Sequence, residues 1–216
     1  MPDHRHHPHQ GHEHDRGVTG LLRYLALLPH MWKSEVGREV VRSIDPQPGE
    51  RVVDLGSGMG AATVIAARTG ASVIAVDPTS YMRRILEVRR RWQRDRGAIA
   101  VVDGAAESIP CADGSVDALW TVNTIHHWTD RATAARELAR VMRHGGRVLL
   151  VDEDFDDPAH PFHERSRARH ARHRHVFDEV DAEALAASLV ASGFASAHGS
   201  RTALAGRPVK LVRATR

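Results

Sequence analysis

From Arg51 onward, short runs of apolar residues alternate with longer amphipathic stretches, and this alternation is the feature that most restricts the fold. Apolar runs of four to six residues are typical of buried strands, and apolar residues at helical spacing indicate helices between them. Strands separated by helices need crossover connections, so the sequence predicts an α/β fold with a doubly wound, mostly parallel sheet and helices on both faces. The predicted strands are 51–55, 72–76, 99–102, 116–121 and 147–151, and the predicted helices are 59–69, 79–94 and 130–143.

The N-terminal part of the chain has a different pattern. Residues 1–17 contain six histidines and no apolar periodicity, which predicts a disordered tail. Residues 20–43 carry apolar residues at helical spacing and predict two short helices broken at Pro29. We expect these N-terminal helices, within 18–48, to cover the active site.

The C-terminal part completes the expected domain over 49–216. Gly145 and Gly146 are expected to end the helix over 130–143. Residues 158–175 and 181–192 predict two more helices. Residues 194–214, with a turn from Gly206 to Pro208, predict an antiparallel hairpin at one edge of the sheet.

Composition excludes several classes of protein. The 216 residues are 42% hydrophobic and 26% charged, values near those of ordinary globular domains, which excludes a collagen or a wholly disordered chain. The one cysteine, Cys111, rules out an intramolecular disulfide framework and a multi-cysteine zinc site. The net charge is only +3, so nucleic acid is disfavoured as a partner. No run approaches 18 apolar residues and no secretory signal is evident, so we expect no membrane span and a cytoplasmic location.

The turn after the first predicted strand is the most informative segment, and it contains Gly56, Gly58 and Gly60. A parallel strand that leads into a glycine turn and a helix lies where open α/β sheets bind ligands. Glycines let a ligand approach the backbone, and a new helix offers free N–H groups. With Ala61 the turn also satisfies the dinucleotide fingerprint, and Asp77 stands about where the ribose-binding acid belongs. The turn by itself therefore leaves an NAD(P)-dependent oxidoreductase open as an alternative.

Asp54 favours another ligand. Its carboxylate, two residues before the first glycine, would repel a pyrophosphate and attract an ammonium group or a sulfonium centre. With this acid in place, the chain resembles class I S-adenosylmethionine-dependent methyltransferases of the small bacterial type-11 kind, from about residue 35 to the C-terminus. The resemblance implies a Rossmann-like domain, S-adenosyl-L-methionine as cofactor, and methylation of oxygen or nitrogen on a small-molecule acceptor by in-line displacement.

Several motifs carry the resemblance, in the order that the family has them. The glycine turn resembles the motif that wraps the methionine end of the cofactor, and Asp77 resembles the acid that grips the ribose hydroxyls. Met82 resembles an apolar wall for adenine, and residues 106–110 match the family's turn AE-x-[LI]-P. The implied cofactor-binding residues are Asp54, Gly56, Ser57, Gly58, Gly60, Asp77, Pro78, Met82, Asp103, Gly104, Ala105 and Asn123.

Two histidines just past the fourth predicted strand are the candidate catalytic residues. Methyl transfer needs a general base only when the acceptor atom carries a proton, and an unperturbed histidine titrates near neutral pH. His126 and His127 therefore fit the role of a base, with His126 preferred, although the pair could equally serve as packing around the loop and the cofactor.

The segment after the fifth predicted strand is expected to lie near the acceptor. Its phenylalanines, arginines and histidines over 155–175 either cover an anionic acceptor or form a solvated basic helix. No metal site is assigned, because the acids and histidines here lack a tight ligand spacing: Asp152, Glu153, Asp154, His160 and His163. A module that binds a cofactor or a metal without turnover remains a third hypothesis, and a homodimer remains open. Candidate wall residues from the N-terminal helices are Tyr24, His30, Met31 and Trp32.

Overall fold

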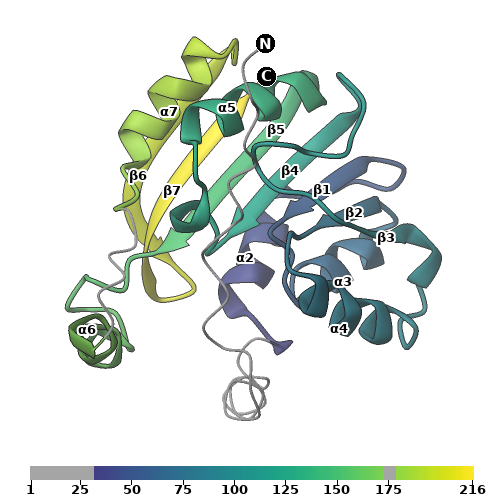
Figure 1. Cartoon of the computed structure of the whole chain (residues 1–216). Helices are drawn as coiled ribbons and strands as arrows, with labels where there is room; N and C mark the ends of the chain where they lie inside the picture. Colours follow the sequence, from purple (N-terminus) through teal and green to yellow (C-terminus); the bar gives the residue numbers. More distant parts are fainter. Residues whose placement is uncertain (1–31, 173–178) are drawn as a thin grey trace, which may run out of the picture.

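A seven-stranded sheet forms the centre of the molecule in the computed structural model, which describes residues 32–172 and 179–216 (Figure 1). The strand order is β3-β2-β1-β4-β5-β7-β6, with neighbours parallel from β3 to β5 and antiparallel at the two pairs that include β7. This confirms the doubly wound sheet and its antiparallel edge hairpin. The strands are β1 (Arg51–Leu55), β2 (Ser72–Val76), β3 (Ile99–Val102), β4 (Val116–Val122), β5 (Met142–Glu153), β6 (Ser196–Leu204) and β7 (Arg207–Thr215).

Helices pack on both faces of the sheet. On one face, α2 and α3 share a core with Val52, Val73 and Trp120, and on the other face α5 and α7 share a core with Val53 and Leu119. Alternate strand residues thus supply the two cores, as the side-chain period of a strand requires. The α-helices are α2 (Glu35–Ile44), α3 (Thr63–Ala66), α4 (Ser80–Arg90), α5 (Arg131–Val141), α6 (His163–Arg172) and α7 (Ala182–Ala191), and short 3-10 turns lie at Ala67–Thr69, Arg96–Ala98 and Ile125–His127.

The junction of α5 and β5 differs from the sequence prediction. The helix ends at Val141, and β5 already begins at Met142, so Gly145 and Gly146 do not end the helix. Instead they lie in an irregularity of β5, between the pairs Val116–Met142 and Ala118–Arg147. Gly145 has φ +78°, and a Cβ on Gly146 would lie 2.8 Å from the carbonyl oxygen of Arg143. The two glycines are therefore needed for a bulge rather than for a helix stop.

The N-terminal helices are described only in part. The first predicted helix, the tail over 1–17, and Tyr24, His30 and Met31 lie outside the described residues. The second helix is α2, which begins after Ser34, whose hydroxyl accepts the Gly37 N–H at 2.8 Å. Its buried face, with Val36 and Val40, belongs to the same core as β1. This packing fixes the start of α2 near the carboxyl end of the sheet.

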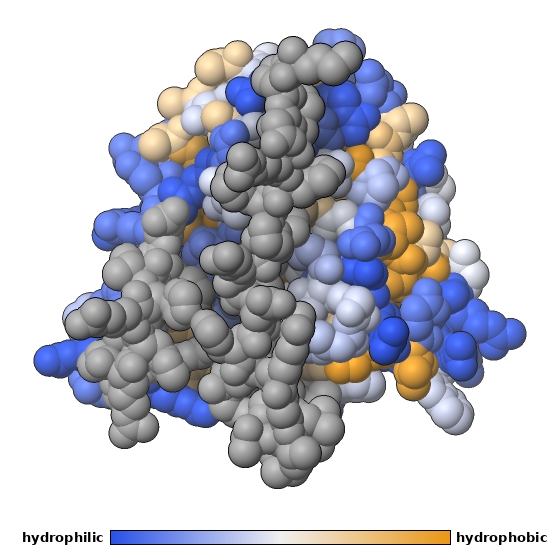
Figure 2. All heavy atoms as spheres, viewed as in Figure 1, coloured by the Kyte–Doolittle hydropathy of each residue, from blue (hydrophilic) through white to orange (hydrophobic). Residues whose placement is uncertain are grey.

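The predicted helix over 181–192 is confirmed as α7, whereas the helix before it begins later than its sequence pattern predicts. The predicted helix over 158–175 begins at His163, after a series of turns, and residues 173–175 lie outside the described part. Figure 1 shows α6 at one end of the molecule, away from the body of the sheet. The surface in Figure 2 is mostly hydrophilic, with hydrophobic residues in separate patches. Within 32–172 and 179–216, no helix is long and apolar enough to cross a membrane.

Candidate active site

A cavity of about 920 Å³ opens at the carboxyl ends of β1, β2, β4 and β5. This is the edge where doubly wound sheets bind ligands, because the loops that leave the strands diverge there. Among the sequence-predicted site residues, those that line the cavity are Asp54, Gly56, Ser57, Gly58, Asp77, Pro78, Met82, Gly104, Ala105, Asn123 and His127. Gly60, Asp103 and His126 are not among its lining residues.

The glycine turn after β1 has the backbone that its sequence requires. Gly56, Gly58 and Gly60 have φ values of +72°, +51° and +75°, a region that other residues rarely adopt. A Cβ on Gly56 would overlap the side chain of Thr124, and a Cβ on Gly60 would overlap Leu86. No described residue lies within 4 Å of the position of a Cβ on Gly58, which faces open space. Gly60 therefore serves close packing, whereas Gly58 leaves room for a ligand against the backbone.

Asp54 is a buried carboxylate in the cavity wall. It is 3% exposed and accepts a hydrogen bond from the Thr63 hydroxyl at 2.5 Å. Burial raises the pKa of Asp54 to about 6, because its ionised form loses hydration there. A cation in the cavity would favour the ionised form, so this position suits a positively charged ligand group.

Asp77 follows β2 and closes the same end of the cavity. Its carboxylate accepts the Gly58 N–H at 2.7 Å and the Thr79 N–H at 2.8 Å, which links the glycine turn after β1 to the turn after β2. Burial raises the pKa of Asp77, and these two hydrogen bonds oppose the rise. Each carboxylate oxygen has a further lone pair, so Asp77 can still accept from two vicinal hydroxyl groups.

The residues of the turn after β3 do not all reach the cavity. A Cβ on Gly104 would lie 2.7 Å from Pro110 and 2.9 Å from Val76, so only glycine fits in this packing. Gly104 and Ala105 line the cavity, but the Asp103 side chain is 73% exposed and pairs with Arg83 at 2.9 Å. Of the acid and the two small residues predicted here, only the small residues reach the cavity wall.

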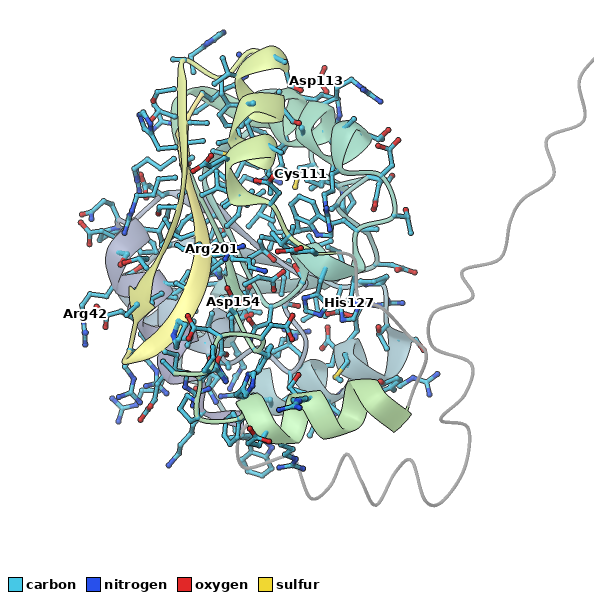
Figure 3. The ribbon with its side chains drawn as sticks, turned by 90° about the vertical axis from the view of Figure 1, so that its left-hand side faces the viewer. Arg42, Cys111, Asp113, His127, Asp154 and Arg201 are labelled. Carbon is cyan, nitrogen blue, oxygen red and sulfur yellow. The ribbon has the colours of Figure 1, made fainter. Side chains whose placement is uncertain are left out.

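The two candidate histidines occupy different positions. His127 lines the cavity, and Figure 3 shows it on the part of the molecule that faces α6. The backbone N–H of His126 donates to Asp152 at 3.0 Å, and its Nδ1 lies 3.1 Å from both oxygens of the same carboxylate. The two rings are 4.0 Å apart. Asp152 thus holds the turn and orients His126 beside His127, the histidine that reaches the cavity.

A polar cluster that the sequence did not predict lies on the β5 side of the cavity. Glu153 is 9% exposed and accepts hydrogen bonds from Asn123 at 2.7 Å, Arg207 at 2.8 Å and His160 at 3.0 Å. Burial raises the pKa of Glu153, but the hydrogen bonds outweigh it and hold the pKa below its ordinary value. Arg207 also lies over the ring of Phe162, 5.4 Å from its centre. Glu153, Arg207 and Phe162 all line the cavity.

This cluster explains why the acids after β5 do not suggest a metal. Asp152 holds His126, Glu153 is held by Arg207, and Asp154 lies 3.5 Å from Lys210. Across the described residues, no group of three or more histidines, cysteines or acids is placed to hold a metal ion. Because β7 runs antiparallel to β5, its first residues reach the cavity. No sequence pattern indicated that Arg207 would do so.

Two other residues have structural roles. The Glu107 carboxylate accepts the N–H groups of Thr129 and Asp130 at 2.7 and 3.1 Å, and so ties its turn to the start of α5. Cys111 is buried, and Figure 3 shows it and Asp113 toward the opposite end of the molecule from α6. The thiol is therefore part of the packing and not of the cavity.

The hydroxyl group of Ser57 is a further feature of the site that fits an S-adenosyl group. The Ser57 hydroxyl is buried and has no hydrogen-bond partner among the described residues. Buried polar atoms are normally satisfied, so a missing partner here points to a polar ligand. Together with the open space at Gly58 and the two buried acids, the turn has an unsatisfied donor, room and negative charge for such a ligand.

Comparisons with known proteins agree with this geometry. A family model described as a methyltransferase domain matches residues 53–150. An uncharacterized methyltransferase of Mycobacterium tuberculosis is 42% identical over 119 residues, 55% of this chain and 46% of that protein. A ubiquinone/menaquinone biosynthesis C-methyltransferase of Rubrivivax gelatinosus is 35% identical over 129 residues, 60% of this chain and 47% of that protein.

A solved structure has the same fold. A putative S-adenosyl-L-methionine-dependent methyltransferase of Methanococcus maripaludis superposes with a TM-score of 0.68 and 18% identity, covering 92% of this chain and 93% of that one. The matches to the curated relatives span about half of their length. The matched region, from β1 into β5, holds the glycine turn and both buried acids. Residues 53–150 thus resemble a methyltransferase domain, and the chain has the Rossmann-like fold of the solved neighbour.

Proposed function

We propose that the protein transfers a methyl group from S-adenosyl-L-methionine to a small-molecule acceptor. The observation that carries this proposal is the pair of buried acids, Asp54 and Asp77, on either side of a glycine turn with open space at Gly58. A sulfonium and an ammonium group complement Asp54, and a ribose complements Asp77.

The residues present would hold the cofactor along one wall of the cavity. The turn of Gly56, Ser57 and Gly58 would hold its methionine end near Asp54. Pro78, Met82, Gly104 and Ala105 would pack against the adenine, and Asn123 would help to position the methionine portion. Gly60 allows the turn to pack closely against Leu86. The exposed Asp103 would contact the cofactor only at the edge of the cavity.

The chain's own residues would supply alignment and proton transfer. S-adenosylmethionine, when bound, provides an electrophilic methyl group on a sulfonium sulfur. Holding an acceptor in line with that methyl can contribute about 7–11 kcal/mol through ordering alone. For a hydroxyl or amine acceptor, we propose that His127 in the cavity wall takes the proton, with His126 and Asp152 positioning it.

The acceptor would occupy the side of the cavity at Glu153, Phe155, Phe162 and Arg207. The first residues of α2 also line the cavity, which supports the proposal that the N-terminal segment covers the acceptor. One curated relative is named as a C-methyltransferase, whereas the sequence analysis expects methylation of oxygen or nitrogen. An acceptor screen with both classes distinguishes them by the mass and position of the product.

Calorimetry tests the proposal directly. We expect S-adenosylmethionine and S-adenosylhomocysteine to bind with a 1:1 stoichiometry, and NADH and NADPH to bind at least about a hundredfold more weakly because Asp54 repels a pyrophosphate. Tight binding of a dinucleotide without binding of S-adenosylhomocysteine would instead establish an oxidoreductase. Cofactor binding without methyl release to any screened acceptor would favour a binding module.

A further inference from the structure

A stripe of exposed apolar residues runs along the outer face of α4 and ends at Trp92. Tyr81, Val88 and Trp92 are 38%, 55% and 84% exposed, and the partly exposed Ile85 lies between them. Spacings of three and four residues place these side chains on one face of the helix. The neighbouring face, with Met82 and Leu86, is buried. The helix α4 thus has two apolar faces, and the described residues pack against only one of them.

Arginines border this stripe. The side chains of Arg84, Arg91, Arg94 and Arg96 are exposed, and the acids nearby are fewer. Of the two acids between residues 80 and 96, Glu87 pairs with Arg90 at 2.7 Å. The outer face of α4 is therefore apolar along its centre and positively charged at its borders.

A shallow hollow lies at the end of the stripe. It has a volume of about 350 Å³ and is lined by Arg68, Trp92, Gln93, Arg94 and Asp95. Two guanidinium groups beside an indole suit a phosphate group, because a guanidinium binds phosphate oxygens in pairs and its charge is never lost near neutral pH.

We propose that this face of α4 docks on an anionic phospholipid bilayer, with a lipid phosphate in the hollow at Arg68 and Arg94. Helices that lie in a membrane interface have an apolar face with aromatic residues and a polar face rich in Lys and Arg. Tryptophan and tyrosine favour the headgroup level, and each basic residue near an anionic surface adds to the attraction.

A bilayer accounts for the face better than a nucleic acid does. A nucleic acid offers phosphates to the arginines and bases to Trp92, but it offers nothing to Val88 and Ile85. A bilayer takes up both kinds of residue. Tyr81 also lines the large cavity, so the docking face continues to the cavity mouth, where an amphiphilic molecule leaving the bilayer would enter. The docking itself does not depend on the reaction that the cavity performs.

Sedimentation of the full-length protein with vesicles tests the proposal. At pH 8, where histidines are neutral, and at low ionic strength, we expect binding to phosphatidylglycerol vesicles and little binding to phosphatidylcholine vesicles. Trp92→Ala is expected to lower the partition coefficient about tenfold through lost apolar contact. The double variant Arg91→Glu with Arg94→Glu is expected to lower it at least about 25-fold.

Matched variants elsewhere serve as controls. Val190→Ala removes an exposed apolar side chain from α7, and Arg165→Glu with Arg167→Glu reverses two exposed charges on α6. Both controls should bind within about twofold of the parent protein. Equal loss in the α6 control would overturn the proposal, as would binding that ignores lipid charge. Binding of duplex DNA, or self-association, that is lost in the α4 variants without any vesicle binding would overturn it in favour of those partners.

Discussion

The two ends of the cavity are built in different ways. At the β1–β2 end, Asp54, Gly58 and Asp77 come from two strand–turn junctions, and the Asp77 carboxylate binds the Gly58 N–H directly. At the β5 end, Glu153 accepts hydrogen bonds from Asn123, His160 and Arg207. These three residues are separated by up to 84 positions in the sequence.

This difference separates what a common cofactor needs from what a particular acceptor needs. Within the part of the chain that the structure describes, the β1–β2 end leaves a buried hydroxyl without a partner and open space at a glycine. At the β5 end, the buried carboxylate is already satisfied by hydrogen bonds from three side chains. In the proposed function, the first end is prepared for the cofactor, and the second holds a fixed charged wall against which an acceptor would be selected.

The largest effect is expected from His127→Ala, in the cavity wall. If His127 is the base for a hydroxyl or amine acceptor, kcat should fall about 10²- to 10⁴-fold while the affinity for S-adenosylhomocysteine stays within about threefold. His126→Ala should cost less, because His126 acts through its neighbour. A greater loss in His126→Ala, or unchanged turnover in both, would refute the assignment.

Gly56→Ala should destabilise the β1–β2 end itself. The new Cβ would overlap Thr124 at a φ of +72°, and overpacking together with left-handed strain should lower the free energy of unfolding by about 2–4 kcal/mol. Gly114→Ala is the matched control: its φ is +59° and nothing lies within 4 Å of a Cβ there, so it should cost only about 1 kcal/mol. Equal losses in urea unfolding would show that the close approach of Thr124 is unimportant.

Asp77→Asn should weaken cofactor binding while the β5 end is left intact. Loss of a charged hydrogen bond to a ribose should raise the Kd for S-adenosylhomocysteine about ten- to hundredfold by calorimetry. Asp103→Asn should change it by less than about threefold, because Asp103 is exposed and outside the cavity wall. The reverse order would place the ribose or the adenine elsewhere.

A pH dependence is also expected from Asp54. Its folded pKa of about 6 lies above the ordinary 3.8, so the folded state binds the proton more tightly, and the stability that this contributes at low pH is lost as pH rises from about 4 to 6. Asp54→Asn should remove that slope in urea unfolding. In the parent protein, affinity for S-adenosylmethionine should rise over the same interval, because the ionised carboxylate attracts the sulfonium. A slope that survives in the variant belongs to another group.

The sequence predicted the β1–β2 end well because its signals are local. Strand, glycine turn and acid follow one another within about 25 residues, and Asp54, Gly58 and Asp77 all line the cavity. Sequence alone could not tell an exposed acid from a buried one at the end of a strand. Asp103 follows its strand as Asp77 does, but its side chain turns outward to Arg83.

The sequence could not predict the β5 end because its contacts are set by strand pairing. Arg207 reaches Glu153 only because β7 pairs antiparallel to β5, and no periodicity in the chain reports that register. For the same reason, no sequence pattern linked Glu153 and His160 to Arg207. The Gly145–Gly146 bulge was also misplaced, because a double glycine is common both after helices and within irregular strands.

A crystal structure of the protein with S-adenosylhomocysteine tests the account most directly. We predict the ribose hydroxyls on the Asp77 carboxylate, the methionine end along Gly56–Gly58 with a hydrogen bond from Ser57, and the sulfur directed toward the wall of Glu153 and Phe162. A ligand bound elsewhere, or one whose sulfur faces away from the β5 end, would contradict the division of the cavity into a cofactor end and an acceptor end.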